Sequence, residues 1–132
     1  MPDTAIPETH RDLLAARPAV TLATIGPDGF PQVTAMWFLV DDNDTVKASL
    51  NTARQKVRNL RRHPEATLFF TDPANPYRTL EIRAMADVAP DPDYEFADRV
   101  GARYGVDLRE RDRPGESRVV VTFTPTRVNT YG

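Results

Sequence analysis

The chain has 132 residues, with 17 Lys and Arg, 19 Asp and Glu, 12 Pro, one Trp and no Cys. This length predicts one domain over residues 1–132, and 40% apolar with 27% charged residues is the composition of an ordinary globular protein. The lack of cysteine excludes disulfides, thiolate chemistry and sulfur-ligated metals. A net charge of -2 gives no general attraction to nucleic acid or anionic lipid, so any anion site has to be local.

The compartment is inferred from two missing patterns. The sequence has no basic-then-apolar stretch at its start and no apolar run of the roughly 20 residues that cross a bilayer. We therefore expect a cytoplasmic protein without a membrane partner.

The first part of the chain predicts a short helix followed by closely spaced strands. The helix is expected at Pro7–Arg17, which carries proline and acids near its start, and Pro18 ends it. Strands rich in β-branched or apolar residues follow, separated by Gly-, Pro- and Asp-containing turns, at Ala19–Ile25, Phe30–Val40 and Thr45–Leu50.

The second part predicts two helices and three strands. Helices are expected at Ala53–Arg62 and Asp91–Tyr104. The remaining segments are the strands Glu65–Thr71, Thr79–Val88 and Arg118–Thr124, the connecting loop Asp72–Arg78, a charged and mobile loop at 106–117, and a tail from Pro125 to Gly132. Six strands at mostly hairpin spacing predict a mainly β fold, a six-stranded antiparallel sheet curled into a small barrel with short flanking helices.

The segment Arg54–Arg62 concentrates positive charge, since it holds five basic side chains and no acid. It begins where a strand passes into a helix, and free backbone N–H groups and the helix dipole favour an anion there. Anion binding and a merely solvated helix face stay equally weighted alternatives. Nucleic-acid binding is disfavoured because the rest of the chain is acidic and would repel a long polyanion.

Other chemistry has little support in the sequence. His10 and His63 lie too far apart for a metal motif, Ser49 and Ser117 have no evident base, and phosphate- or dinucleotide-binding glycine motifs are missing. We predict no metal, and no catalytic side chain can be assigned. The aromatic residues Trp37, Phe69, Phe70 and Phe123 are interpreted as core, although for Trp37 ligand contact remains the alternative.

Four stretches together resemble a known superfamily: GPDGFPQVTAMWF, KASLNTARQKVRNLRRHP, ATLFFTDPANPYRTLEIRA and TPTRVNTYG. They are similar to the flavin/deazaflavin oxidoreductase superfamily, which has the pyridoxamine 5'-phosphate oxidase-like split β-barrel. The chain looks most like its coenzyme F420-dependent branch, in which an Arg-x-Lys pair meets the cofactor phosphate. The matching residues here are Arg54 and Lys56.

The resemblance also implies a set of cofactor-binding residues. The strand residues Thr34, Ala35, Met36 and Trp37 would line the ring, and the ribityl chain and phosphate would lie near Ser49, Asn51 and Thr52. Members of the superfamily build each site at a homodimer interface, so Tyr77 and Arg78 are expected to reach into the partner's site.

Three positions depart from the pattern. Ala35 stands where relatives often have Pro, and Ala84 follows Arg83 where many have Gly. Gln55 occupies the middle of what is usually Ser-Arg-Lys in the oxidase branch. The last difference argues against pyridoxamine 5'-phosphate oxidase activity.

The resemblance implies hydride transfer from reduced deazaflavin to a small unsaturated substrate such as an enone, a quinone or a tetrapyrrole. Arg58, Arg61 and Arg62 exceed what a single phosphate needs, which favours the longer anion of coenzyme F420 over FMN. An FMN-dependent oxidoreductase and a non-catalytic deazaflavin carrier remain the alternatives, with an RNA-binding module the least favoured.

Overall fold

The computed structural model describes residues 4–15 and 19–132. Its centre is one antiparallel sheet of seven strands in the order β2-β1-β5-β6-β7-β4-β3. The strands are β1 (Val20–Ile25), β2 (Pro31–Met36), β3 (Leu39–Val40), β4 (Val46–Asn51), β5 (Glu65–Asp72), β6 (Asn75–Pro90) and β7 (Arg118–Tyr131). The helices are the 3-10 helices η1 (Glu8–Ala15) and η2 (Leu108–Arg111) and the α-helices α1 (Gln55–Arg62) and α2 (Glu95–Tyr104).

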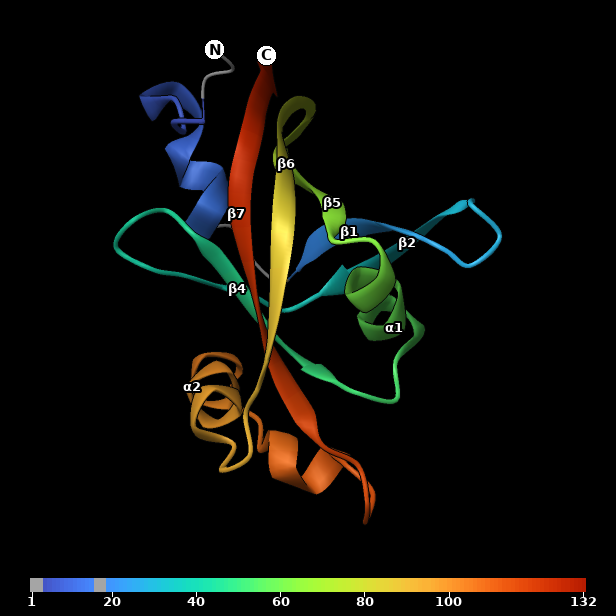
Figure 1. Ribbon diagram of the computed structural model, residues 1–132. Helices are drawn as coiled ribbons and strands as arrows, with labels where there is room; N and C mark the ends of the chain where they lie inside the picture. Colours follow the sequence, from blue (N-terminus) through green and yellow to red (C-terminus); the bar gives the residue numbers. More distant parts are fainter. Residues whose placement is uncertain (1–3, 16–18) are drawn as a thin grey trace.

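The sheet curls into a half-barrel around the main core. Figure 1 shows the long strands β6 and β7 side by side through the middle, with α2 and η2 at the end away from the C-terminus. Alternating strand residues such as Leu22, Leu68 and Val121 are fully buried inside the curl. Val57 and Leu60 of α1 join the same cluster, so α1 packs on the core with one apolar stripe and leaves its arginines outside. A smaller cluster attaches α2 and η2 to the sheet.

The mainly β antiparallel fold is confirmed, but the sheet has seven strands because the expected strand Phe30–Val40 is broken. Its first part, β2, pairs with β1, and its last part, β3, pairs with β4. Phe38 lies at the break, buried, with its backbone N–H donating to the Tyr104 hydroxyl and its carbonyl accepting from it, each at 3.2 Å. The Tyr104 hydroxyl thus takes the place of the hydrogen bonds that a neighbouring strand would make to the Phe38 backbone. Only Trp37 and Phe38 connect β2 and β3, which lie at the two ends of the sheet.

Two segments expected to be irregular are strand. The predicted loop Asp72–Arg78 is a tight hairpin turn, because β6 already begins at Asn75 and pairs with Asp72. The predicted tail belongs to β7, which pairs with β6 as far as Thr79 opposite Tyr131. A long neighbouring strand supplies the hydrogen-bond partners that a tail would lack.

All three predicted helices begin later than expected, at Glu8, Gln55 and Glu95. The first is a 3-10 helix ending at Ala15, and the rest of the prediction, Ala16 to Pro18, lies outside the described residues. Helix α2 starts at Glu95 because the Asp91 carboxylate accepts hydrogen bonds from the backbone N–H groups of Phe96 and Ala97 at its first turn.

Two further predictions change. The charged loop 106–117 was expected to be mobile, yet it contains η2 and is tied to the sheet by the side chain of Asp112. Phe70 and Phe123 are core residues as predicted, whereas Phe69 is 39% exposed. Its position on β5 places it on the outer face of the sheet, one residue away from buried Leu68 and Phe70.

Candidate functional site

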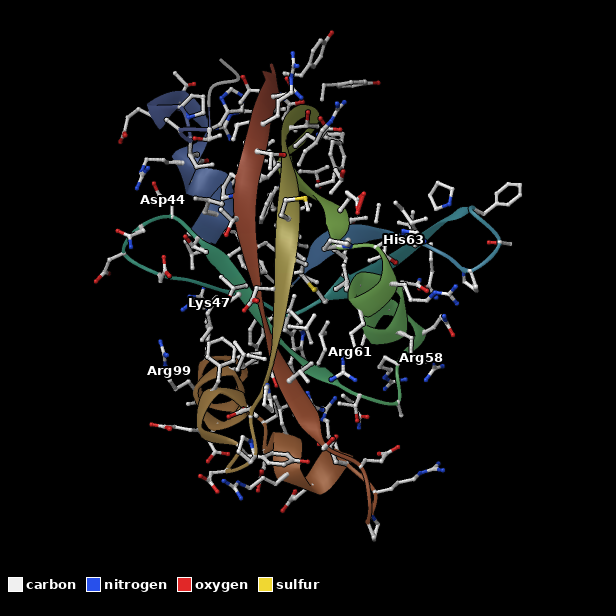
Figure 2. The ribbon with its side chains drawn as sticks, viewed as in Figure 1. Asp44, Lys47, Arg58, Arg61, His63 and Arg99 are labelled. Atoms are coloured by element: carbon white, nitrogen blue, oxygen red, sulfur yellow. The ribbon has the colours of Figure 1, made fainter. Side chains whose placement is uncertain are left out.

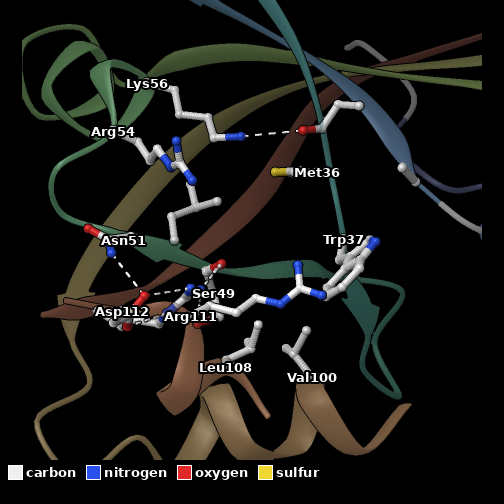
Figure 3. Close-up of a pocket in the computed structure, with 14 residues that line it drawn as sticks. Met36, Trp37, Ser49, Asn51, Arg54, Lys56, Val100, Leu108, Arg111 and Asp112 are labelled. Carbon is white, nitrogen blue, oxygen red and sulfur yellow. Dashed lines mark hydrogen bonds and ion pairs between the residues drawn. The ribbon is translucent and has the colours of Figure 1, made fainter. Parts of the chain in front are cut away.

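A cleft of about 310 Å³ opens where the ends of β2 and β4 meet the start of α1, α2 and η2 (Figure 3). Seven of the predicted site residues line it: Ala35, Met36, Trp37, Ser49, Asn51, Arg54 and Lys56. Residues that are distant in the sequence thus come together at one site.

The turn after β4 carries Arg54 and Lys56 into the cleft. Asn51 organises this turn, since its side-chain oxygen accepts from the N–H of Ala53 at 2.8 Å and its carbonyl accepts from the N–H of Arg54 at 3.0 Å. Helix α1 then begins at Gln55 without a side-chain cap or an acid in its first turn. The positive end of the helix dipole and the two cationic side chains therefore lie at the same place, and their attractions for an anion add together.

Lys56 is half-buried, and its ammonium has only weak partners. Nζ lies 3.4 Å from the Thr34 hydroxyl and 3.4 Å from the Ala35 carbonyl. Burial, and then the positive charge of Arg54, lower the pKa of Lys56 from its ordinary value. Neither Arg54 nor Lys56 forms an ion pair with any carboxylate of residues 4–15 or 19–132. The pair can accept an anion without first breaking a salt bridge.

Six predicted residues lie outside the cleft lining, and four of them are on β2, in the turn after β4 or on α1. The Thr34 hydroxyl accepts a hydrogen bond from Lys56, which itself lines the cleft. The Thr52 hydroxyl hydrogen-bonds to Ser117. Arg58 folds back onto its own helix, donating to Gln55 and to the Ala53 carbonyl. Arg61 is exposed further along α1, where Figure 2 labels both arginines.

Tyr77 and Arg78 lie in the β5–β6 hairpin and do not line the cleft of their own chain. Tyr77 is 76% exposed. Arg78 is held by ion pairs with Asp12 and with Asp72, the latter at 3.0 Å. Their predicted contact with a partner's site remains a prediction.

Several lining residues escaped the sequence reasoning, chief among them Asp112 and Arg118. The Asp112 side chain is 4% exposed and accepts from Arg118, from Asn51 at 2.9 Å and from the Tyr94 hydroxyl at 2.7 Å. Burial alone would raise the pKa of Asp112, but these hydrogen bonds outweigh it and hold that pKa below its usual range. Asp112 therefore stays ionised at neutral pH.

Trp37 was interpreted as core, with ligand contact as the alternative; it is half-buried, packs against the smaller hydrophobic cluster and also lines the cleft. Its ring stacks on Tyr104 with 4.6 Å between the centroids and 8° between the planes. The guanidinium of Arg111, a cleft residue that the sequence did not reveal, lies 5.2 Å from the centroid of the same ring. The sequence of the charged loop does not show which of its arginines contacts the cleft, or which aromatic ring that arginine packs against.

Within the described part of the chain no group of His, Cys, Asp or Glu is arranged to hold a metal. No described helix is both long and apolar enough to cross a membrane. His10, one of the two histidines, is buried and hydrogen-bonds to the Tyr131 carbonyl, which is a packing role.

An antiparallel half-barrel with a cleft beside the start of a helix defines a split-barrel protein. The model of the pyridoxamine 5'-phosphate oxidase family matches residues 6–132, and the chain belongs to this family. No curated protein matches it significantly.

Solved structures agree with this assignment. An F420 reductase is 37% identical, with a TM-score of 0.80, over 94% of this chain and 98% of that one. A conserved hypothetical protein from Mycobacterium tuberculosis is 28% identical, with a TM-score of 0.76, over 98% of this chain and 86% of its own. A pyridoxamine 5'-phosphate oxidase-like protein from Listeria innocua, 21% identical with a TM-score of 0.65 over 93% and 95% of the two chains, shares the fold.

Proposed function

We propose that the protein is a coenzyme F420-dependent oxidoreductase that delivers hydride to a small unsaturated substrate. The observation that carries this proposal is the Arg54–Lys56 pair, which faces the cleft without a carboxylate partner among the described residues. The F420 reductase at 37% identity supports the deazaflavin as the cofactor.

The residues present fit such a cofactor. Arg54 supplies a planar fork and Lys56 a point charge for the phosphate, beside the N–H groups at the start of α1. Strand β2 is at an end of the sheet, so its outer backbone edge can bond a polar ring edge, with Met36 and Leu50 as apolar surface nearby. When bound in its reduced form, the deazaflavin supplies a hydride, and the acceptor double bond takes it up together with a proton.

The proton is assigned to water. Asp112 is the one carboxylate among the lining residues, and it stays ionised because its hydrogen-bond donors depress its pKa. An ionised carboxylate held by Arg118 is a poor proton donor. The chain's contribution is then to position both reactants and to supply electrostatic stabilisation.

FMN is the second candidate cofactor, favoured by the family match itself. One phosphate would satisfy Arg54 and Lys56 and leave Arg58 and Arg61 without an anionic partner, although Arg58 also hydrogen-bonds within its own helix. The acidic tail of coenzyme F420 would offer both arginines such a partner. A non-catalytic deazaflavin carrier would bind in the same manner and reduce nothing.

We further propose a cytoplasmic homodimer in which the partner completes the site. The cleft volume of about 310 Å³ is at the lower end of the range for ligand pockets, roughly 300 to 1,000 Å³, so one chain covers a large ring incompletely. The exposed Tyr77 is available to a second subunit.

The deciding experiment titrates the purified apo-protein with oxidised coenzyme F420 and, separately, with FMN, following cofactor absorbance and fluorescence. Arg54→Ala and Lys56→Ala should weaken F420 binding by about 1.5 to 3 kcal/mol, the scale of hydrogen bonds to charged groups, with little change in melting temperature. Arg99→Ala, on the exposed face of α2, is the matched control and should bind as the parent does.

Three results would count against the proposal. Tighter binding of FMN would overturn the cofactor assignment. Parent-like affinity with a lower melting temperature in both cleft variants would make the pair structural. Tight binding of reduced F420 without turnover of enones, quinones or tetrapyrroles would favour the carrier.

A further inference from the structure

Arg111 is a third unpaired cation of the cleft, separate from Arg54 and Lys56. It ends η2 and lines the cleft, and no described carboxylate forms an ion pair with it. Figure 3 shows its side chain extending toward Trp37, on the side of the cleft away from Arg54 and Lys56.

The surroundings hold this guanidinium in place. The next residue, Asp112, is anchored by its hydrogen bonds, and Leu108 at the start of η2 is buried. A parallel Tyr104 ring at 4.6 Å covers one face of Trp37, which leaves the other face to Arg111. Trp37 is thus a platform for Arg111 and is not free to stack on a ligand.

The charges of the cleft show what Arg111 is available for. The lining holds four cationic side chains and the single carboxylate Asp112, which neutralises Arg118. A cofactor phosphate offsets Arg54 and Lys56. Arg111 then remains unbalanced beside the apolar side chains of Val100 and Leu108. Arg111 is itself an exposed residue, and its planar guanidinium, placed over the Trp37 ring, matches a carboxylate in shape and charge.

We propose that Arg111 binds a carboxylate of the hydride acceptor, so that the preferred substrates are unsaturated carboxylic acids. The identification of the carboxylate as the substrate's rests on the proposed function of the cleft. Arg111 is accordingly a specificity-determining residue, and the Trp37–Tyr104 stack is its support.

The first test uses cofactor-free protein, because Trp37 is the one tryptophan of the chain and its fluorescence reports directly on Arg111. The probes are cyclohex-1-ene-1-carboxylate and its neutral carboxamide. The acid should give a saturable fluorescence change and the amide a much weaker one. Arg111→Gln should weaken acid binding about tenfold, as expected for the loss of one charge-assisted contact.

Two more variants keep this test interpretable. Arg111→Lys retains the charge without the fork and should fall between the parent and Arg111→Gln. Arg113→Gln, an exposed arginine two residues away that does not line the cleft, should bind as the parent does. Equal affinity for acid and amide, or parent-like acid binding by Arg111→Gln, would overturn the proposal.

The second test separates a substrate carboxylate from the carboxylates of the cofactor tail. Arg111→Gln should bind coenzyme F420 within about twofold of the parent and lose the preference for acid over amide in the reductase assay. A fall of about tenfold in F420 affinity with the acid preference intact would assign Arg111 to the tail and overturn the proposal.

The third measurement distinguishes failure of this inference from failure of the proposed function. In the Arg54→Gln/Lys56→Gln double variant, the cations for the phosphate are gone but Arg111 remains, so the acid titration should persist without cofactor binding. Loss of the acid response in this variant would show that the acid binds at the phosphate site, against the proposal. If the parent binds the acid at Arg111 but binds no deazaflavin, the carboxylate site stands and the proposed function fails.

Discussion

Arg118 donates two hydrogen bonds to Asp112, from Nε at 2.8 Å and from Nη2 at 2.9 Å, and the two side chains are only 10% and 4% exposed. Arg118 begins β7, and Asp112 follows η2, so the pair fastens the charged loop to the sheet. The loop that carries Arg111 is therefore a fixed wall of the cleft.

Asp112→Asn should lower the free energy of unfolding by about 3 kcal/mol at neutral pH, because it leaves the buried Arg118 charge without its partner. The measurement is urea unfolding of both proteins. Arg113→Gln is the exposed control from the same loop and should change stability by less than about 0.5 kcal/mol.

The same variant has a defined pH dependence. The pKa of Asp112 is depressed in the folded protein, so its contribution is present above the unfolded value of about 4 and is lost as pH falls through the folded pKa. The stability difference between parent and Asp112→Asn should thus be full at neutral pH and shrink in acid. A difference that stays constant down to about pH 2 would contradict this explanation.

Cofactor binding should weaken at high pH through Lys56. Burial and the neighbouring Arg54 lower the pKa of the Lys56 ammonium. Its charge is therefore lost at a pH below the ordinary lysine pKa of about 10.4, and the affinity for the cofactor should fall at that pH. In Arg54→Ala the Coulombic part is removed, and the fall should move to higher pH even though binding is weaker overall. Fluorescence titrations across the alkaline range test this, with Lys56→Ala as the variant in which the fall should disappear.

Arg58→Ala and Arg61→Ala should weaken binding of long-tailed coenzyme F420 by up to about 1 kcal/mol each and leave FMN binding unchanged, since exposed ion pairs are weak. The loss should grow with the number of glutamates in the tail and shrink as salt is added, because the screening length is about 8 to 10 Å at 0.1 to 0.15 M. Calorimetry with short- and long-tailed cofactors provides the comparison. Equal affinity for both at low salt would remove the electrostatic argument for the deazaflavin.

The homodimer is tested by sedimentation together with Tyr77. This side chain is exposed at a hairpin tip, so Tyr77→Ala should leave chain stability almost unchanged and weaken cofactor binding through the partner's site. Arg78→Ala should in contrast lower stability, since it removes the ion pairs with Asp12 and Asp72. A stable monomer that binds the cofactor at micromolar concentration would contradict the dimer.

The sequence alone was sufficient for the mainly β fold and for the cationic part of the site. Strand positions such as Val20–Ile25 and Val46–Asn51 follow from the local pattern of apolar residues and from the turn residues between strands. These features are local and do not depend on how the chain packs. The basic segment Arg54–Arg62 was also recognisable, because its place between a strand and a helix is a property of neighbouring residues, whereas the pairing of Arg54 with Lys56 came from the family resemblance.

The tertiary structure decided what depends on distant partners. Tyr104, 66 residues from Phe38, bonds the backbone at the break that separates β2 from β3 and so shapes the half-barrel. Arg111 and Asp112 belong to a loop of alternating charges, and they differ from the other charged residues of the loop by their contacts with Trp37 and Arg118. Asp112 and Arg118 are only six residues apart, but the sequence does not show that their side chains turn toward each other. Arg111 and Trp37 are far apart in the sequence and meet only because the curl of the sheet brings the loop against the end of β2.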